Sequence, residues 1–308
     1  MISGFMPIRN ALRLGYPFRE AIASAHAVVD ELVVVDGYSE DGTYLILEEL
    51  ARTFPKIRLR QHPWDPVSIN GSAFRNAANF ARAAATGDYL LQLDASDVIP
   101  EEDVEPIREL PRRFPRKELF GLPYIQLLGC IEFTSEMRWR FSRNLPSIRS
   151  IYDGWTMGYA LRPVDLARPR EWKRLLARAA VRLLQDHVAE DFPEQLVVLP
   201  RPIFHYYGMF PSAFLEKMGS KIFLQRNPRY AELTAKNPAV DRILEQYRST
   251  GDWDAFWEEA RAFTQELGAR GPLNKVIDTH RRIPPELHPA IVRSQIGRAA
   301  YDPNAPLG

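Results

Sequence analysis

Residues 90–99 have the sequence LLQLDASDVI, in which an apolar run ends abruptly in two acidic residues, Asp94 and Asp97. A short unbroken apolar run is typical of a β-strand that is buried on both faces of a parallel sheet. Ligands of open α/β sheets bind beyond the carboxyl ends of such strands. The segment therefore predicts either a metal and phosphate site at a strand end or a strand that runs out into a polar turn.

The residues before this segment alternate between strand and helix patterns. Apolar or alternating runs typical of strands occupy residues 2–8, 32–35, 56–60 and 89–93. Apolar residues at helical spacing follow Pro17 and recur in residues 47–54 and 74–85. This β-α-β-α-β-α-β order predicts an α/β fold, with an open, mainly parallel sheet and helices on both faces.

The remainder of the chain is less regular. Strand patterns occupy residues 119–128, 138–142 and 195–199, and residues 171–185 have the pattern of an Arg-rich helix. Beyond residue 210 almost all patterns are helical, including one aromatic stripe in residues 253–267. We therefore expect a first domain of residues 1–210 and a helical C-terminal appendage of residues 211–308.

Composition narrows the class of protein. The chain has 308 residues and a net charge of +1, so it lacks the bulk basic charge of a nucleic-acid-binding protein. Its single cysteine, Cys130, excludes an internal disulfide, and its apolar neighbours predict a buried thiol. No apolar run approaches the ~20 residues that span a bilayer, and no secretory signal pattern opens the chain. These features predict a cytoplasmic protein.

A second acidic residue follows a buried strand pattern, in the segment LVVVDGYSEDGT of residues 32–43. Asp36 ends the apolar run, Gly37 lets the backbone turn, and Asp41 is suited to cap the next helix. A carboxylate at this place can accept hydrogen bonds from a nucleotide base or a ribose hydroxyl. The alternative is an ordinary junction between a strand and a helix.

Four segments together resemble family 2 glycosyltransferases, which have the GT-A fold. They are VVVDGYSEDGT, FRNAANFARAAATGDY, GDYLLQLDASDVI and VVLPRPIFHYY, and they occur in the order of that family. The nearest resemblance is to the bacterial lipopolysaccharide-core and cell-surface glucosyltransferase branch. The resemblance does not cover the C-terminal end of the chain.

This resemblance implies an enzyme that transfers a sugar from a nucleotide diphosphate sugar donor to a hydroxyl of a saccharide or glycolipid acceptor. It implies a role in surface polysaccharide or glycolipid synthesis, which is compatible with peripheral contact with a membrane. The donor-binding positions that it implies are Pro7, Arg9, Asp36, Arg75 and Asp94.

The resemblance also implies a divalent cation, Mn²⁺ or Mg²⁺, that neutralises the leaving diphosphate. Its ligands would be Asp94, Asp97 and His205, and the imidazole would favour Mn²⁺. Ser96 stands where the family usually has an aspartate, so the sequence predicts a weakened site. The same departure favours activity without a metal, or a loss of activity.

An inverting transferase needs a general base that deprotonates the acceptor hydroxyl. In the family an acid precedes the late histidine, and Asp186 has a matching position here. Glu190 lies one helical turn further and on the same face, while Asp153 and Asp191 are weaker candidates. The alternative is that these acids only solvate the end of a helix.

Three other functions are compatible with parts of the sequence. A GT-A-like protein could bind nucleotide sugars without catalysis, which the serine at position 96 favours. A nucleotidyltransferase would need a Gly-rich loop after the first strand, and residues 6–17 lack one. The aromatic stripe of residues 253–267 could serve protein interaction.

Residues 138–143, RWRFSR, predict either an acceptor site for anionic sugars or a solvated strand face.

Overall fold

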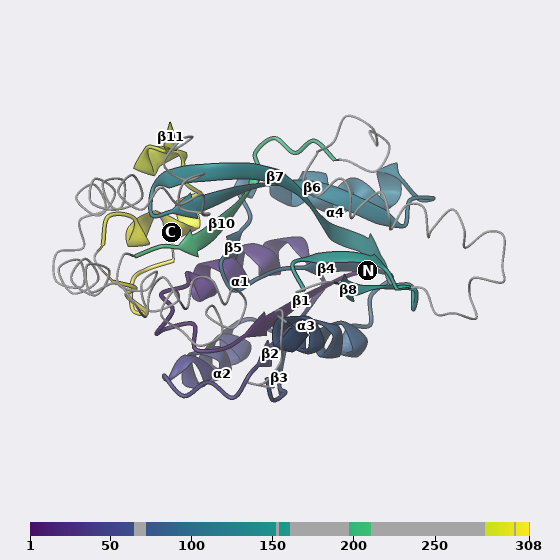
Figure 1. Ribbon diagram of the computed structural model, residues 1–308, viewed down its shortest axis with the longest axis horizontal. Helices are drawn as coiled ribbons and strands as arrows, with labels where there is room; N and C mark the ends of the chain where they lie inside the picture. The colour runs from purple at the N-terminus through teal and green to yellow at the C-terminus, as the bar shows by residue number, and fades with distance from the viewer. Residues whose placement is uncertain (65–71, 152–153, 161–196, 211–280, 299, 308) are drawn as a thin grey trace, which may run out of the picture.

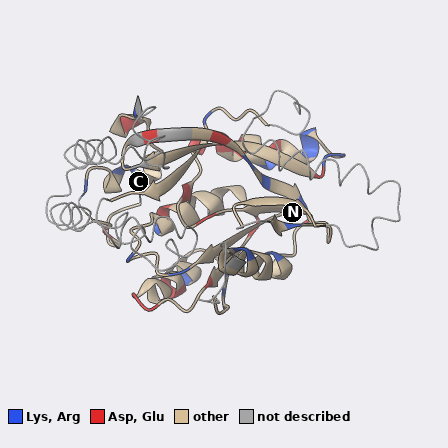
Figure 2. Cartoon of the chain, in the orientation of Figure 1, with Lys and Arg blue, Asp and Glu red and all other residues tan. Residues whose placement is uncertain are grey.

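The computed structural model describes residues 1–64, 72–151, 154–160, 197–210, 281–298 and 300–307. These residues form a mixed α/β fold in which one large twisted sheet is flanked by helices (Figure 1). Basic and acidic residues are interspersed over its elements (Figure 2). None of the described helices is long and apolar enough to cross a membrane.

The first half of the fold follows the predicted alternation of strands and helices. Its elements are β1 (Ile2–Ile8), α1 (Phe18–Val28), β2 (Glu31–Asp36), α2 (Thr43–Thr53), β3 (Ile57–Gln61), α3 (Ser72–Ala84) and β4 (Tyr89–Gln92). Parallel pairing joins them in the order β3-β2-β1-β4. The open α/β sheet expected from the sequence is therefore confirmed.

The second half adds strands of both directions. Its elements are β5 (Asp97–Val98), the 3₁₀ turn η2 (Glu101–Asp103), α4 (Val104–Arg113), β6 (Leu119–Leu128), β7 (Ile131–Arg143), β8 (Ile148–Ile151), β9 (Thr156–Tyr159) and β10 (Ile203–Gly208). The main sheet continues from β4 through β7, β6 and β10 to β5. β7 runs antiparallel to β4 and β6, while β6 and β10 are parallel.

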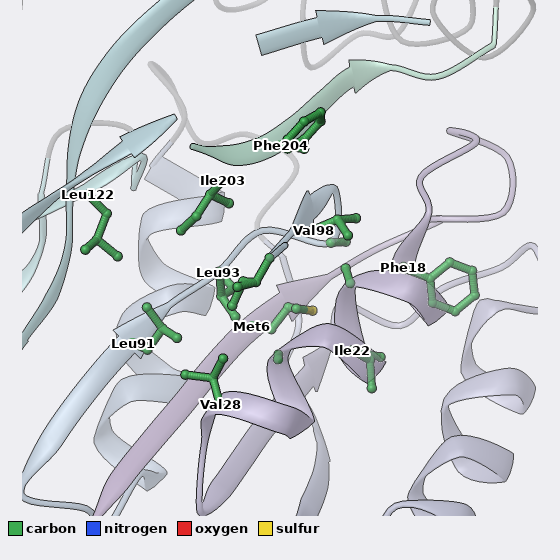
Figure 3. Packing of buried hydrophobic residues seen from close by; sticks show 14 of the residues in the cluster. Met6, Phe18, Ile22, Val28, Leu91, Leu93, Val98, Leu122, Ile203 and Phe204 are labelled. Carbon is green, nitrogen blue, oxygen red and sulfur yellow. The ribbon is translucent and has the colours of Figure 1, made fainter. Parts of the chain in front are cut away.

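Strand alternation divides the core into two layers. In β1, Met6 and Ile8 join the cluster that packs against α1, whereas Phe5 faces the opposite side, where Ala78 and Ala81 of α3 pack. Figure 3 shows the first cluster, where α1, β1, β4 and β10 contribute side chains. Both faces of the parallel strands are thus buried, as their continuous apolar sequences predict.

Two expectations from the sequence are wrong in this half. The strand predicted for residues 195–199 is absent from its described part, Val197–Leu199, and β10 begins instead at Ile203. Pro200 and Pro202 explain the displacement, since proline has no N–H to donate to a sheet ladder. Cys130 is partly exposed rather than buried, because it lies in the tight turn between β6 and β7.

The described C-terminal residues pack against β7 and α1. β11 (Arg281–Arg282) pairs with β7, and the 3₁₀ turns η4 (Pro285–Leu287) and η5 (Ala290–Gln295) follow it. The buried side chain of Gln295 donates a hydrogen bond to Glu20 of α1 at 3.0 Å. The domain boundary near residue 210 stays a prediction, and the helices expected between residues 211 and 280 lie outside the described residues.

Candidate functional site

Asp36 ends β2 and is fully buried. Its carboxylate accepts hydrogen bonds from the backbone N–H and the hydroxyl of Ser39, and from Gln61 Nε2 at 3.1 Å. This local turn fixes the loop after β2, because short aspartate side chains often bond the backbone a few residues ahead. Asp36 therefore shapes the loop at the strand end where the sequence predicts a nucleotide contact.

Hydrogen bonds join this loop to the one after β1. The N–H of Asn10 donates to Ser39 Oγ at 2.9 Å, and the N–H of Glu40 donates to Asn10 Oδ1 at 2.9 Å. Arg9 Nη2 lies 3.9 Å from Glu40 Oε1. The carboxylate of Asp41 accepts the N–H of Thr43, the first residue of α2, but the N-cap position itself is Gly42, one residue after the predicted cap.

Trp64 lies directly against this pair of loops. A Cβ atom on Gly37 would be 2.7 Å from Trp64 Cδ1 and 3.0 Å from Arg9 Cβ, so only glycine permits the contact. The indole also meets Phe74 of α3 edge-on, with ring centroids 5.8 Å apart. Sequence reasoning missed Trp64, although an aromatic residue shortly after β3 was a visible signal.

The acidic segment of residues 94–97 forms a compact turn beyond the end of β4. Asp97 N–H donates to the carbonyl oxygen of Asp94 at 3.0 Å, and Asp94 N–H donates to Asp97 Oδ2 at 2.8 Å. The chain turns after Ser96, as the sequence requires if Asp97 is to reach the site. Strand β5 then pairs Asp97 with His205 of β10.

The structure brings the three predicted metal ligands together. Asp97 Oδ1 lies 2.7 Å from His205 Nδ1, and Asp94, Asp97 and His205 each offer a ligand atom within 4.8 Å of the others. All three residues are buried. By ligand type and distance, this cluster is a candidate metal site among the described residues.

Two arginines of β7 complete the cluster. Arg140 donates from Nη1 to Asp94 Oδ1 at 2.8 Å and from Nη2 to Asp94 Oδ2 at 2.9 Å. The register of β6 and β7 passes from Phe120–Phe141 to Gly121–Trp139, which leaves Arg140 as the extra residue of a β-bulge. Bulges re-aim side chains and are frequent beside active sites.

Arg138 lies next to Asp94 and between aromatic rings. Its guanidinium carbon is 5.1 Å from the ring centre of Tyr124 and 4.8 Å from that of Trp155, and its Nη1 is 3.9 Å from Asp94 Oδ2. Its Nε donates to Glu136 Oε1. Arg138 and Arg140 are both buried, so the solvated strand face considered for residues 138–143 is wrong at these two positions.

Burial and charge shape the ionisation of this cluster. Burial raises the pKa of Asp97, although Arg140 and Arg138 oppose the shift. Burial alone would lower the pKa of Arg140, but the charge and hydrogen bonds of Asp94 raise it instead. The buried guanidinium of Arg140 therefore keeps its positive charge beside Asp94.

The remaining predicted site residues divide into two groups. Pro7 lies in β1 opposite Val35 of β2. The pairing of β1 with β4 ends at Phe5, so the missing N–H of Pro7 costs no hydrogen bond to β4. Arg75 lies in the first turn of α3, where its backbone would be 2.9 Å from a Cβ atom on Gly154. The predicted bases and their alternatives lie outside the described residues: Asp186, Glu190, Asp153 and Asp191.

Residues 4–114 match the model of the family described as Glycosyl transferase family 2. The matched segment runs from β1 to the end of α4, so it contains Asp36, Asp94 and Asp97 but neither β7 nor β10. The match thus covers roughly the first third of the chain. No curated protein matches the sequence.

Several solved structures are similar to this chain at low identity. TarS 1-349 of S. aureus is 14% identical over 95% of this chain and 85% of its own, with a TM-score of 0.39. Its complex with UDP-GlcNAc is 21% identical over 41% of this chain and 34% of its own, with a TM-score of 0.31. The mannosyltransferase PcManGT of Pyrobaculum calidifontis, in complex with GDP-Man and Mn²⁺, is 20% identical over 41% of this chain and 35% of its own, with a TM-score of 0.30.

This chain thus covers only about a third of the length of two of these structures. At such TM-scores the similarities say nothing about function, which is inferred below from the domain match and the site itself.

Proposed function

We propose that this protein is a glycosyltransferase that moves a sugar from a nucleoside diphosphate sugar to an acceptor hydroxyl. One observation carries the proposal. The segment that matches family 2 glycosyltransferases contains two strand ends with acidic residues, Asp36 as the last residue of β2 and Asp94 after β4. In open α/β sheets this edge, beyond the carboxyl ends of the strands, is the place where ligands bind.

The order of strands supports one orientation of the donor. β1 separates β2 from β4, so Asp36 and Asp94 lie about two strand spacings apart, or ~10 Å. The base and ribose would lie at the β2 end, close to Asp36 and Trp64. The diphosphate would lie towards Asp94, where the arginines of β7 begin. Pro7, Arg9 and Arg75 stay proposed donor contacts in the surrounding loops and helix.

The predicted cation, Mn²⁺ or Mg²⁺, stays a proposal. Asp94, Asp97 and His205 would hold it, and a bound cation would act as a Lewis acid on the diphosphate. The donor set, two carboxylates and one imidazole, favours Mn²⁺ over Mg²⁺. In the structure these ligands are bonded to Arg140 and to one another, which opposes a cation, so donor binding without a metal is the alternative.

The stereochemical course and the acceptor are also proposals. An inverting reaction would need a general base, and Asp186 is the first candidate from its position before His205, with Glu190 as the second. The acceptor would be a saccharide or glycolipid of the bacterial cell surface, as the resemblance to the lipopolysaccharide-core branch implies.

A binding panel tests the proposed function. UDP, GDP and their sugar conjugates, among them UDP-GlcNAc and GDP-mannose, would be added to the full-length protein and its melting temperature measured. A ligand present at 100 times its Kd should add about 2.7 kcal/mol to the free energy of unfolding. Inorganic diphosphate and free sugars are the controls. If no nucleotide raises the melting temperature above these controls, the proposed function is wrong.

A second candidate function is nucleotide-sugar binding without catalysis. Two observations favour it: Ser96 replaces the usual aspartate, and Asp94 is fully paired with Arg140. Release of nucleoside diphosphate from a bound nucleotide sugar, followed by mass spectrometry, separates the two functions. Release that Asp97→Asn abolishes supports the transferase, whereas tight binding with no turnover supports the second candidate.

A further inference from the structure

The candidate metal ligands are already engaged with one another and with arginine. Both carboxylate oxygens of Asp94 accept hydrogen bonds from Arg140. Asp97 Oδ2 accepts the N–H of Asp94, and Asp97 Oδ1 contacts His205 Nδ1. A cation on the remaining lone pairs of Asp94 would lie directly beside the guanidinium of Arg140. Arranged in this way, the donor set does not suit a divalent ion.

The acids of the cluster already have arginines beside them. Arg140 contacts Asp94 and lies 3.9 Å from Asp97, and Arg138 contacts Glu136 and lies 3.9 Å from Asp94. A dication would add two further positive charges within a buried group that already contains two guanidinium ions. Like charges repel strongly where water is excluded, so the two guanidinium ions oppose a cation at this place.

Arg138 has unused hydrogen-bonding capacity in this cluster. Its side chain is only 4% exposed, and neither Nη1 nor Nη2 has a hydrogen-bond partner among the described residues. The rings of Tyr124 and Trp155 stabilise its charge but offer no acceptor to its N–H groups. Buried polar groups are almost always bonded, so such an exception calls for an explanation such as a ligand.

We propose that Arg138 supplies the positive charge that binds the diphosphate of the donor, and that donor binding consequently requires no divalent cation. This inference rests on the proposed function. A guanidinium presents planar paired donors that match the oxygens of a phosphate group. Arg140 is a positioning residue, because it holds Asp94 and thereby keeps the carboxylate from competing with the diphosphate for Arg138.

The strand arrangement puts Arg138 where the diphosphate is expected. β7 pairs with β4 only near its C-terminal end, where Phe141 lies opposite Leu91. The earlier residues of β7 extend beyond the carboxyl end of β4. Arg138 consequently lies beside Asp94, beyond the carboxyl end of β4. This is the side towards which a nucleotide with its base at Asp36 would direct its phosphates.

Calorimetric titration of UDP and GDP tests this inference. Each nucleotide is titrated into the wild-type protein in EDTA and again in Mn²⁺, and the affinities should agree within about twofold. Arg138→Met should weaken binding in EDTA by about 10- to 100-fold, the range for a hydrogen bond to a charged group. Arg143→Met is the matched control on the same strand, since its guanidinium contacts Tyr89 outside the cluster. It should bind as the wild type does.

Each contrary result has a separate meaning. Binding that occurs only in Mn²⁺ overturns this inference and leaves the proposed function standing. Equal affinity of Arg138→Met and wild type also overturns it. If neither nucleotide nor any nucleotide sugar binds in either condition, the proposed function fails as well. Should Arg138→Met not fold, Arg138→Lys keeps the charge but loses the planar fork, and an unchanged affinity in EDTA would contradict the expected loss.

Discussion

Arg140 binds both carboxylate oxygens of Asp94, with Nη1–Oδ1 and Nη2–Oδ2 distances of 2.8 and 2.9 Å, and the arginine side chain is completely buried. The pair joins the end of β4 to a bulge in β7. The acidic residue that the sequence assigns to a metal or ribose is thus held by a side chain from outside the matched family segment.

We expect Arg140→Met to destabilise the fold by about 3–5 kcal/mol, because it leaves the carboxylate of Asp94 buried without its partner. Urea denaturation measures this loss. The double variant with Asp94→Leu removes both charges, so it should recover most of the lost stability. If Arg140→Met alone is neutral, the pair is not formed in solution.

Ser96→Asp should strengthen cation binding. Ser96 Oγ lies 3.4 Å from His205 Nδ1, so a carboxylate there would add a further negative charge to the cluster without a further arginine. We expect Mn²⁺ affinity, measured by electron paramagnetic resonance, to rise at least about tenfold. Ser96→Asn is the uncharged control, and equal Mn²⁺ affinity of the two variants would show that charge does not limit cation binding at the cluster.

Asp186→Asn should leave donor affinity unchanged and lower sugar transfer at least ~100-fold, as expected for the loss of a general base. The measurement is transfer rate at saturating donor, together with donor affinity by calorimetry. Glu190→Gln is the companion variant, because Glu190 is the second candidate. An unchanged rate in Asp186→Asn, with a reduced rate in Glu190→Gln, would move the assignment to Glu190.

His288 should make the fold sensitive to acid. It accepts a hydrogen bond from the Tyr206 hydroxyl at 2.8 Å and donates one to the carbonyl oxygen of Ile283 at 3.3 Å, which requires a neutral ring. Burial lowers the pKa of His288 to about 4. In the unfolded chain the pKa of a histidine is about 6.5. Between pH 6.5 and 4 the unfolded chain therefore binds a proton at His288, while the folded protein does not.

The free energy of unfolding should therefore fall by up to about 3 kcal/mol as the pH decreases from 6.5 to 4. His288→Gln can keep both hydrogen bonds without titrating, so its stability should depend less on pH over this range. Chemical denaturation at several pH values checks this. Parallel curves for the two proteins would show that His288 does not contribute.

The parallel half of the fold was predictable because the residues of each strand and helix themselves show the pattern of that element. The buried run of residues 32–35 and the residues that follow Pro17 form β2 and α1, since burial on both sheet faces and a single helix stripe leave clear patterns. β10 was misplaced because its apolar run adjoins Pro200 and Pro202, which look like a strand end rather than a strand start.

The acidic part of the site was predictable for a similar reason. Asp94 and Asp97 lie beside strand ends, and the family resemblance brings His205, which lies within β10, to the same place. Arg138 and Arg140 could not be found in this way. An arginine in an alternating strand is normally exposed. Arg140 is buried because it lies in a β-bulge and contacts the carboxylate of Asp94, which is distant in the sequence.

The central claim is that a nucleoside diphosphate binds across the ends of β1, β2 and β4, and calorimetric comparison of the wild type with Asp36→Ala tests it most directly. Asp41→Ala, which alters the same loop nearer to α2, is the control for loop disturbance. We expect UDP or GDP to bind the wild type and Asp41→Ala alike, and to bind Asp36→Ala about 1.5–3 kcal/mol more weakly. Equal affinity for wild type and Asp36→Ala, or no binding of any nucleoside diphosphate to the wild type, would contradict the account.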